Sequence, residues 1–245
     1  MLNCFGLFIQ PNLKIVSIED TQEIKLPHQN WQIMVTRQGL DVGAGAIGER
    51  GRGAISMFDL LRAALRQRPD YIIVGEIRGE EAYALFQAMS TGHLGLTTIH
   101  AEHVQGVLHR LTTKPMDIPP TLVENLDAIA IIRRLVVDNV SKRRTIMVHE
   151  MGGMDQTTGK FITHPIFDWY ASDDSYSQIG ESIILKEISQ QGVYSTEEIR
   201  EELEKRRIIL EYMVRKNIRT YDEVTDIIME YFKTPDIVYR RARVS

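Results

Sequence analysis

Short apolar runs in this sequence are followed directly by acidic or imidazole side chains, groups that can handle phosphates, metal ions and protons. The runs and the groups that follow them are residues 14–18 with Glu19, Asp20 and Glu23, residues 71–74 with Glu76 and Arg78, and residues 96–99 with His100. In open α/β sheets ligands bind outside the carboxyl ends of the strands, so these groups are expected at one functional edge. Carboxylates at such an edge orient Mg²⁺ or an attacking water in nucleotide hydrolases, and an imidazole can donate a hydrogen bond to a phosphate oxygen. The pattern therefore favours a site that processes a polyanion.

Each of these groups also has an ordinary structural interpretation when it is taken alone. Glu76 and Arg78 fit a solvated pair at a strand end, the acids of the first run fit a polar turn or helix start, and His93 and His100 fit turn histidines. A zinc site lacks support, because residues 100–103 do not have the H-E-x-x-H spacing and a single cysteine excludes the common multi-cysteine sets. An all-histidine or carboxylate metal site stays open. We prefer one shared site, because it accounts for all three strand ends together.

The glycine-rich segment 43–48 matches the dinucleotide pattern G-x-G-x-x-G only in its letters. That pattern must lie on the turn from a strand into a helix, whereas here the glycines continue through Gly51 and Gly53. We therefore interpret the segment as a flexible loop that carries Arg50 and Arg52.

The elements that must position these groups alternate between strands and helices up to about residue 135. Apolar residues recur at helical spacing over residues 55–68 and 80–89, between the strands named above. Such alternation predicts right-handed crossovers and a mostly parallel sheet covered by helices, which is an α/β fold. Beyond this core the sequence predicts two more strands at 145–148 and 160–162, two helices that start with capping boxes at 195–198 and 220–223, and a linker at 168–178.

The composition is that of an ordinary globular protein and excludes disordered and fibrous classes. Of the 245 residues, 43% are hydrophobic and 25% are charged, with a formal net charge of −4 that gives no general attraction to nucleic acid. The basic clusters at 205–207 and 240–243 are explained as solvated helix faces, so no nucleic acid is expected as a partner. Residues 1–9 lack a basic flank, residues 82–101 are interrupted by small polar residues, and one cysteine fits a reducing compartment. These features predict a cytoplasmic protein.

Four longer motifs occur in a fixed order along the chain. They are the acidic stretch 19–23, the arginine-bearing helix 61–70 with Arg62 and Arg66, the segment 74–78, and the stretch 90–100 with a histidine near each end. In this order they resemble the acidic box, the arginine-bearing helix, the Walker B segment and the histidine box of the ring-forming ATPases that drive type II secretion, type IV pilus and archaellum assembly. The stretches MSTGH, TIHA and GEIRGEEA are nearer to the archaeal branch of that family, and the resemblance runs from residue 1 to about residue 238.

The resemblance implies a RecA-like P-loop NTPase core with a C-terminal helical appendage, and it implies ATP and Mg²⁺ as ligands. It further implies a homo-hexamer, or a mixed ring with copies of the full-length ATPase, in which neighbouring subunits hold the nucleotide between them. An inner-membrane platform protein is the implied partner, so that a cytoplasmic motor would be peripheral to the membrane through that partner.

Roles for individual residues follow from the same resemblance. Glu76 would orient Mg²⁺ through water or orient the attacking water itself, and Glu23 is the best candidate for the general base, with Glu19 beside it. Contacts with the nucleotide or its phosphates are assigned to His100, His93, Arg62, Arg66 and Arg78. The two helix arginines would position the site or reach a neighbour's nucleotide, with a solvated helix face as the alternative. For Arg78 the alternative is a structural role, and Gly79 follows it where bacterial relatives usually have Asp.

The printed sequence departs from the family at its start. The motif G-x-x-x-x-G-K-[ST], whose amides and lysine hold the phosphates, does not occur in it, and residues 1–3 resemble the helix that follows that motif. We therefore expect a RecA-like motor domain at 1–167, truncated just after the P-loop, and a mainly helical subdomain at 168–245. The expected function is a motor ATPase fragment that is inactive and does not bind ATP on its own. The alternative is a non-catalytic interaction or regulatory module that docks onto a complete secretion ATPase.

Overall fold

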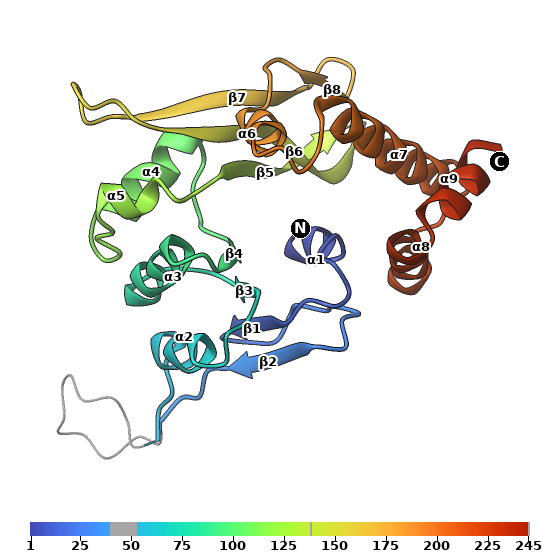
Figure 1. The fold of residues 1–245 in the computed structure, drawn as a ribbon. Coiled ribbons are helices and arrows are strands. Elements are labelled where there is room, and N and C mark those ends of the chain that lie inside the picture. Colours follow the sequence, from blue (N-terminus) through green and yellow to red (C-terminus); the bar gives the residue numbers. More distant parts are fainter. Residues whose placement is uncertain (40–52, 138, 245) are drawn as a thin grey trace. The chain divides into compact units, whose positions relative to one another are not determined.

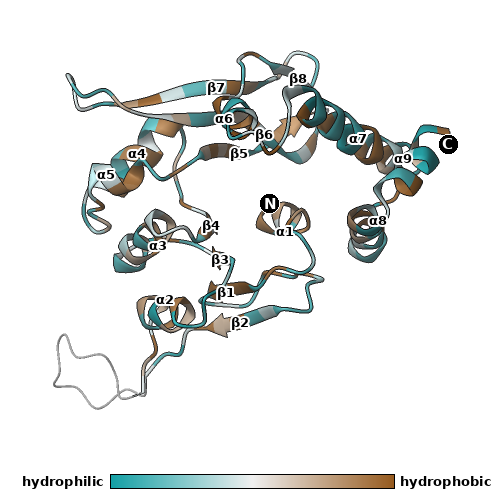
Figure 2. Cartoon of the chain, in the orientation of Figure 1, coloured by the Kyte–Doolittle hydropathy of each residue, from teal (hydrophilic) through white to brown (hydrophobic). Residues whose placement is uncertain are grey.

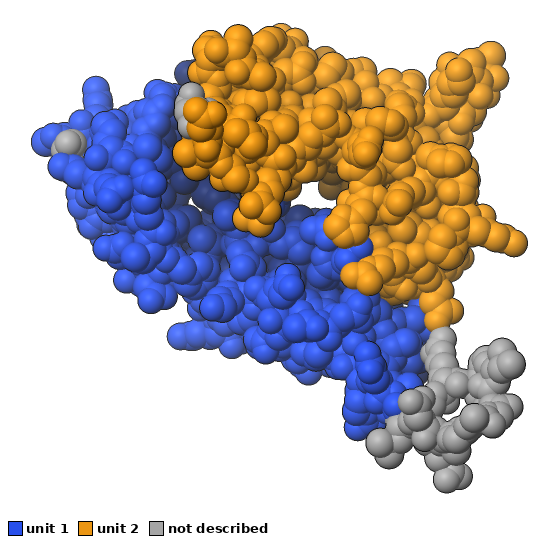
Figure 3. Space-filling view, turned by 180° about the vertical axis from the view of Figure 1, so that it is seen from behind, with its two compact units in different colours: residues 1–76, 93–98, 192–245 blue, residues 77–92, 99–191 orange. Residues whose placement is uncertain are grey.

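The computed structural model describes residues 1–39, 53–137 and 139–244, and it forms two compact units. Unit 1 contains residues 1–76, 93–98 and 192–245, and unit 2 contains residues 77–92 and 99–191 (Figure 3). The glycine-rich segment 43–48, with Arg50 and Arg52, lies outside the described residues. The two units are described separately below.

The sheet of unit 1 is the parallel sheet that the alternating pattern predicts (Figure 1). Its strands are β2 (Trp31–Val35), β1 (Ile15–Glu19), β3 (Tyr71–Val74) and β4 (Leu94–Thr97), in the spatial order β2-β1-β3-β4. All three pairings are parallel, with Ile18 opposite Val74 and Val74 opposite Thr97. All carboxyl ends therefore lie at one edge, and the predicted α/β fold with a mostly parallel sheet is confirmed.

Strand β1 is the best-buried strand of this sheet, and every one of its residues is buried. Its hydrophobic character is visible in Figure 2, and it matches the near-continuous apolar runs of strands that are covered on both faces. The one hydroxyl inside the strand is satisfied, because Ser17 Oγ accepts a hydrogen bond of 2.8 Å from Trp31 Nε1. Beside β1 and β2 lies α2 (Met57–Leu65), which begins with a capping box formed by Ser56 and Asp59.

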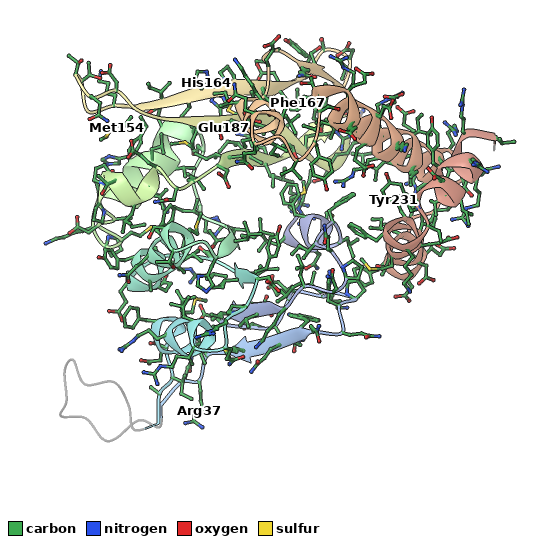
Figure 4. The ribbon with its side chains drawn as sticks, in the orientation of Figure 1. Arg37, Met154, His164, Phe167, Glu187 and Tyr231 are labelled. Carbon is green, nitrogen blue, oxygen red and sulfur yellow. The ribbon has the colours of Figure 1, made fainter. Side chains whose placement is uncertain are left out.

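The remaining helices of unit 1 come from both ends of the chain. They are α1 (Leu2–Gly6), α7 (Thr196–Arg215), α8 (Tyr221–Lys233) and α9 (Pro235–Val244). The expected helix starts are confirmed, since Ser195 and Thr220 are the N-caps of α7 and α8. The complete capping box forms at Ser195, whereas the Thr220 side chain accepts from the Glu223 amide only. One buried cluster joins the segment after α1 to the three C-terminal helices: Leu7, Ile209, Met213, Ile228, Tyr231, Val238 and Ala242. Tyr231, labelled in Figure 4, also donates a hydrogen bond of 2.8 Å to Glu202 Oε2 and thereby ties α8 to α7.

Unit 2 combines helices with an antiparallel sheet. Its helices are α3 (Glu80–Ser90), α4 (Val104–Thr112), α5 (Pro120–Val123) and α6 (Ile183–Gln190). Its strands, in the spatial order β5-β6-β7-β8, are β5 (Ala128–Val137), β6 (Val140–Met154), β7 (Phe161–Tyr170) and β8 (Ser175–Gln178). The strands predicted at 145–148 and 160–162 are thus parts of the much longer β6 and β7. Buried Glu150 on β6 accepts hydrogen bonds from Ser182 Oγ and from the amides of Ile183 and Ile184, which fastens the start of α6 to the sheet.

The prediction of a linker at 168–178 is wrong, because these residues complete β7, form a turn and then form β8. Asp174 in the turn accepts two hydrogen bonds from the Arg144 guanidinium, at 2.7 and 2.6 Å, and one from Trp169 Nε1 at 2.8 Å. These donors hold the pKa of the Asp174 carboxyl well below its usual range. An Asp-rich and Ser-rich stretch therefore forms a hairpin, since its acid is matched by a cation on a neighbouring strand. The division into a motor domain at 1–167 and a helical subdomain at 168–245 stays a proposal.

Candidate nucleotide site

The carboxyl edge of the unit 1 sheet brings together two of the predicted acids. Strand β1 ends at Glu19, and the neighbouring strand β3 is followed by Gly75 and Glu76. The amide of Gly75 donates a hydrogen bond of 2.9 Å to the carbonyl of Ile18, so the two strand segments stay paired up to this point. A Cβ at residue 75 would lie 3.1 Å from Glu19 Cγ. Glycine thus allows the Glu19 side chain to lie directly against the backbone that leads to Glu76.

Glu19 is a buried carboxylate that holds the following loop. Its side chain is almost wholly enclosed, with 3% of the residue exposed. Oε1 accepts hydrogen bonds of 3.0 Å from the amides of both Glu23 and Ile24, whereas Oε2 is buried and has no hydrogen-bond partner among the described residues. A carboxylate that caps two amides in this way fixes the path of the chain. Glu19 and Glu23 belong to the same acidic stretch of the sequence, but the structure gives them different environments. Glu19 is buried and holds the backbone of the loop that carries Glu23.

Glu23 is exposed, and within the described residues its carboxylate makes no hydrogen bond or ion pair. Its backbone is nevertheless held on both sides. The amide donates to Glu19 Oε1 at 3.0 Å, and the carbonyl accepts from Asn3 Nδ2 at 3.4 Å. An exposed carboxylate on a fixed backbone can accept a proton from a water molecule, which is what a general base requires.

The segment that carries Glu76 is braced from β4. Thr98 follows β4, and its Oγ1 donates a hydrogen bond of 2.6 Å to the carbonyl of Gly75. Glu76 itself is half-buried. The sequence reasoning missed Gly75, Thr98 and Asn3 as positioning residues. A glycine directly before the acid was the available signal for the first, whereas the contacts of Thr98 and Asn3 depend on how the chain folds back.

Arg62 lies on α2, whose buried residues are Leu61 and Ala64, and Arg66 is the C-cap residue just after the helix ends. Both arginine side chains are exposed. The Arg62 guanidinium carbon lies 5.8 Å from the centroid of the Phe58 ring, a distance at which a cation and an aromatic face attract each other. Two exposed guanidinium groups, one in the last turn of α2 and one at its C-cap, suit contact with an anion as well as a solvated surface, so their role stays a prediction.

His93 lies away from these acids. It precedes Leu94, the first residue of β4, and the Leu94 amide donates to the carbonyl of Asp70 just before β3. This is the amino edge of the parallel sheet, opposite to the edge of Glu19 and Glu76. Unit 1 therefore brings Glu19, Glu23 and Glu76 to one edge and leaves His93 at the other.

Arg78 and His100 belong to unit 2, where both side chains are exposed. The backbone amides at Arg78 and Gly79 are hydrogen-bonded by the side chain of Glu81, which follows shortly after them in the sequence. Glu81 Oε1 accepts hydrogen bonds from the amides of Arg78 at 2.5 Å and Gly79 at 2.7 Å, which caps the start of α3. The amides of Arg78 and Gly79 therefore already have an acceptor within the chain, the carboxylate of Glu81.

The donor set fits magnesium better than a metal with a full protein cage. In the described part of the chain no group of three or more His, Cys, Asp or Glu side chains is arranged to hold a metal ion. Mg²⁺ is usually held by one or two carboxylates together with waters and substrate phosphates, so a single half-buried acid such as Glu76 fits it.

None of the described helices combines the length and apolar character needed to cross a membrane.

Comparisons with known proteins give the family. A family model described as type II/IV secretion system protein matches residues 2–230. One uncharacterized protein of Methanocaldococcus jannaschii is 45% identical over 231 residues, which are 94% of this chain and 82% of that protein. A second from the same organism is 39% identical over 238 residues, 95% of this chain and 41% of that protein. A solved structure, the VirB11 ATPase from the Brucella suis type IV secretion system in complex with sulphate, is 22% identical with a TM-score of 0.46, over 60% of this chain and 44% of that one.

The chain thus spans less than half the length of the second relative and of the VirB11 structure. The similarity to the two relatives extends over nearly the whole of this chain. The family model covers almost the whole sequence, including the acidic, Walker B and histidine segments. The chain therefore belongs to the type II/IV secretion system protein family, which contains the secretion and pilus motor ATPases.

Proposed function

We propose that this chain is part of a motor ATPase that powers type II secretion, type IV pilus assembly or archaellum assembly by hydrolysing ATP in a hexameric ring. The observation that carries the proposal is the placement of Glu19 and Glu76 at the carboxyl ends of two neighbouring parallel strands, with exposed Glu23 on the loop that Glu19 holds. Membership of the secretion ATPase family supports ATP and Mg²⁺ as the ligands. The proposed partners are further copies of the full-length ATPase and an inner-membrane platform protein, with the motor in the cytoplasm.

The chemistry assigned to the chain is the transfer of the terminal phosphoryl group to water. Glu23 takes the proton of the attacking water, and Glu19 keeps the Glu23 backbone in place without taking part in proton transfer. Glu76 orients the metal-bound water or the attacking water. Bound Mg²⁺ neutralises charge that develops on the phosphate oxygens. His100, Arg78, Arg62 and Arg66 supply hydrogen bonds or positive charge to phosphates, the two helix arginines to the nucleotide of a neighbouring subunit.

Phosphate release from ATP by the purified full-length protein tests this function. We expect release that depends on Mg²⁺ and stops when EDTA is added, because the metal must screen the phosphate charge. Gel filtration with light scattering should show a ring-sized assembly in the presence of ATP. A full-length protein that releases no phosphate above the buffer rate would contradict the proposal, and it would favour a module that docks onto a complete secretion ATPase without hydrolysing ATP.

A further inference from the structure

The loop that carries Glu23 is held by a side chain from α1 that the proposed chemistry does not use. Asn3 Nδ2 donates to the carbonyl of Glu23 at 3.4 Å, and Asn3 Oδ1 accepts from the amide of Lys25 at 3.2 Å. One carboxamide therefore bridges the two peptide groups on either side of Ile24, as a neighbouring strand would do. Ile24 itself is buried in the cluster of Ile9, Ile15 and Ile73, so the bridge and the buried side chain fix the loop together.

The same loop is tied to the C-terminal helices. The hydroxyl of Tyr221, the first residue of α8, donates a hydrogen bond of 2.8 Å to the carbonyl of Lys25. Burial raises the pKa of Tyr221, which keeps the hydroxyl protonated and able to donate. The contact joins residues that are 196 positions apart in the sequence.

Helix α8 is itself firmly placed within unit 1. Its residues Ile228 and Tyr231 pack in the cluster that includes Leu7 from the segment after α1, and Tyr231 donates to Glu202 on α7. A movement of α7 and α8 would therefore act on the Lys25 carbonyl through this hydrogen bond, which lies at the surface of unit 1.

We propose that Asn3 and Tyr221 are positioning residues for Glu23, so that the C-terminal helices set the rate of ATP turnover through the loop after β1. This inference rests on the proposed function of Glu23 as the general base. Neither residue touches the reacting atoms. Loss of either contact lets the Glu23 carboxylate spread over more positions, which lowers the fraction of encounters in which it can take a proton from water.

Asn3→Ala and Tyr221→Phe in the full-length protein test this role. Alanine is favourable in a helix, and phenylalanine keeps the ring of Tyr221, so each change removes hydrogen bonds with little other disturbance. Loss of one hydrogen bond predicts a fall in kcat of about 5-fold for Tyr221→Phe, and loss of two predicts about 10-fold or more for Asn3→Ala. KM for ATP should stay within about twofold, since neither side chain is assigned to nucleotide binding. Hydrogen–deuterium exchange of the segment 20–26 should become faster in both variants.

The matched controls are Asn12→Ala and Tyr194→Phe, whose side chains are exposed and make no hydrogen bond within the described residues. Both should leave kcat and the exchange of residues 20–26 unchanged. Unchanged exchange in Asn3→Ala and Tyr221→Phe would overturn the inference, because the contacts would not hold the loop. Faster exchange in these two variants with a wild-type kcat would also overturn the inference. The turnover of Glu23→Gln, measured alongside, then shows whether the coupling alone fails or the role of Glu23 as the base fails too. If Glu23→Gln is inactive, the proposed function stands without this coupling; if Glu23→Gln is fully active, the proposed role of Glu23 fails and the inference falls with it.

Discussion

Replacement of Glu76 by glutamine is expected to lower the ATP turnover of the full-length protein by about 100-fold or more, with ATP binding retained. Glutamine has nearly the same shape, so the half-buried position after β3 stays filled and the pairing of Gly75 with Ile18 is kept. What is lost is the negative charge that orients the metal-bound or attacking water. Phosphate release at saturating Mg-ATP, together with equilibrium dialysis of radiolabelled ATP, separates turnover from binding.

Glu201→Gln is the matched control for that experiment. Glu201 is an exposed glutamate on α7, and within the described residues its carboxylate makes no ion pair or hydrogen bond, so its variant should keep wild-type turnover. If Glu76→Gln hydrolysed ATP at the rate of this control, the assignment of Glu76 to the water or the metal would be excluded.

Glu19→Ala is expected to lower the free energy of unfolding by about 1–3 kcal/mol and to reduce ATP turnover as well. The change removes the acceptor for the amides of Glu23 and Ile24, and the Ile24 amide is buried where water cannot replace the lost bond. The loop then loses its fixed path, although the carboxylate of Glu23 is still present. Urea denaturation followed by circular dichroism measures the loss of stability.

Glu23→Ala serves as the stability control, because it shortens an exposed glutamate in the same loop. Its free energy of unfolding should lie within about 0.5 kcal/mol of the wild type. Equal destabilisation by the two alanine variants would show that the burial of Glu19 and its two hydrogen bonds do not stabilise the fold.

The parallel core could be predicted from the sequence because its strands carry a strong local signal. Residues 71–74 are an uninterrupted apolar run, and they form β3 with the predicted bounds. Strand β2 was missed because it is the edge strand and is half exposed, with Gln32 inside it, so its sequence shows no clear run. In unit 2 the basic residues 133–134 interrupt the apolar pattern of β5, which was missed, and the basic residues 142–144 interrupt β6, of which only a piece could be recognised.

The candidate site was predictable as far as strand order determines it. Acids at the ends of neighbouring parallel strands must share an edge, which brings Glu19 and Glu76 together. The different environments of Glu19 and Glu23 were not predictable, because they arise from a loop that folds back onto the side chain preceding it. The contacts of Asn3 and Tyr221 with that loop also depend on tertiary structure, since nothing in the local sequence specifies their partners.

The most direct test of the account is the ATP turnover of Glu23→Gln compared with that of Glu19→Gln in the full-length protein. Glutamine at residue 19 still offers a carbonyl oxygen to the amides of Glu23 and Ile24, so the loop and its exposed carboxylate should keep their places. We predict that Glu19→Gln retains turnover within about tenfold of the wild type, whereas Glu23→Gln loses about 100-fold or more because no base remains. The reverse order, with Glu23→Gln active and Glu19→Gln inactive, would contradict the assignment of Glu23 as the base and of Glu19 as the residue that positions it.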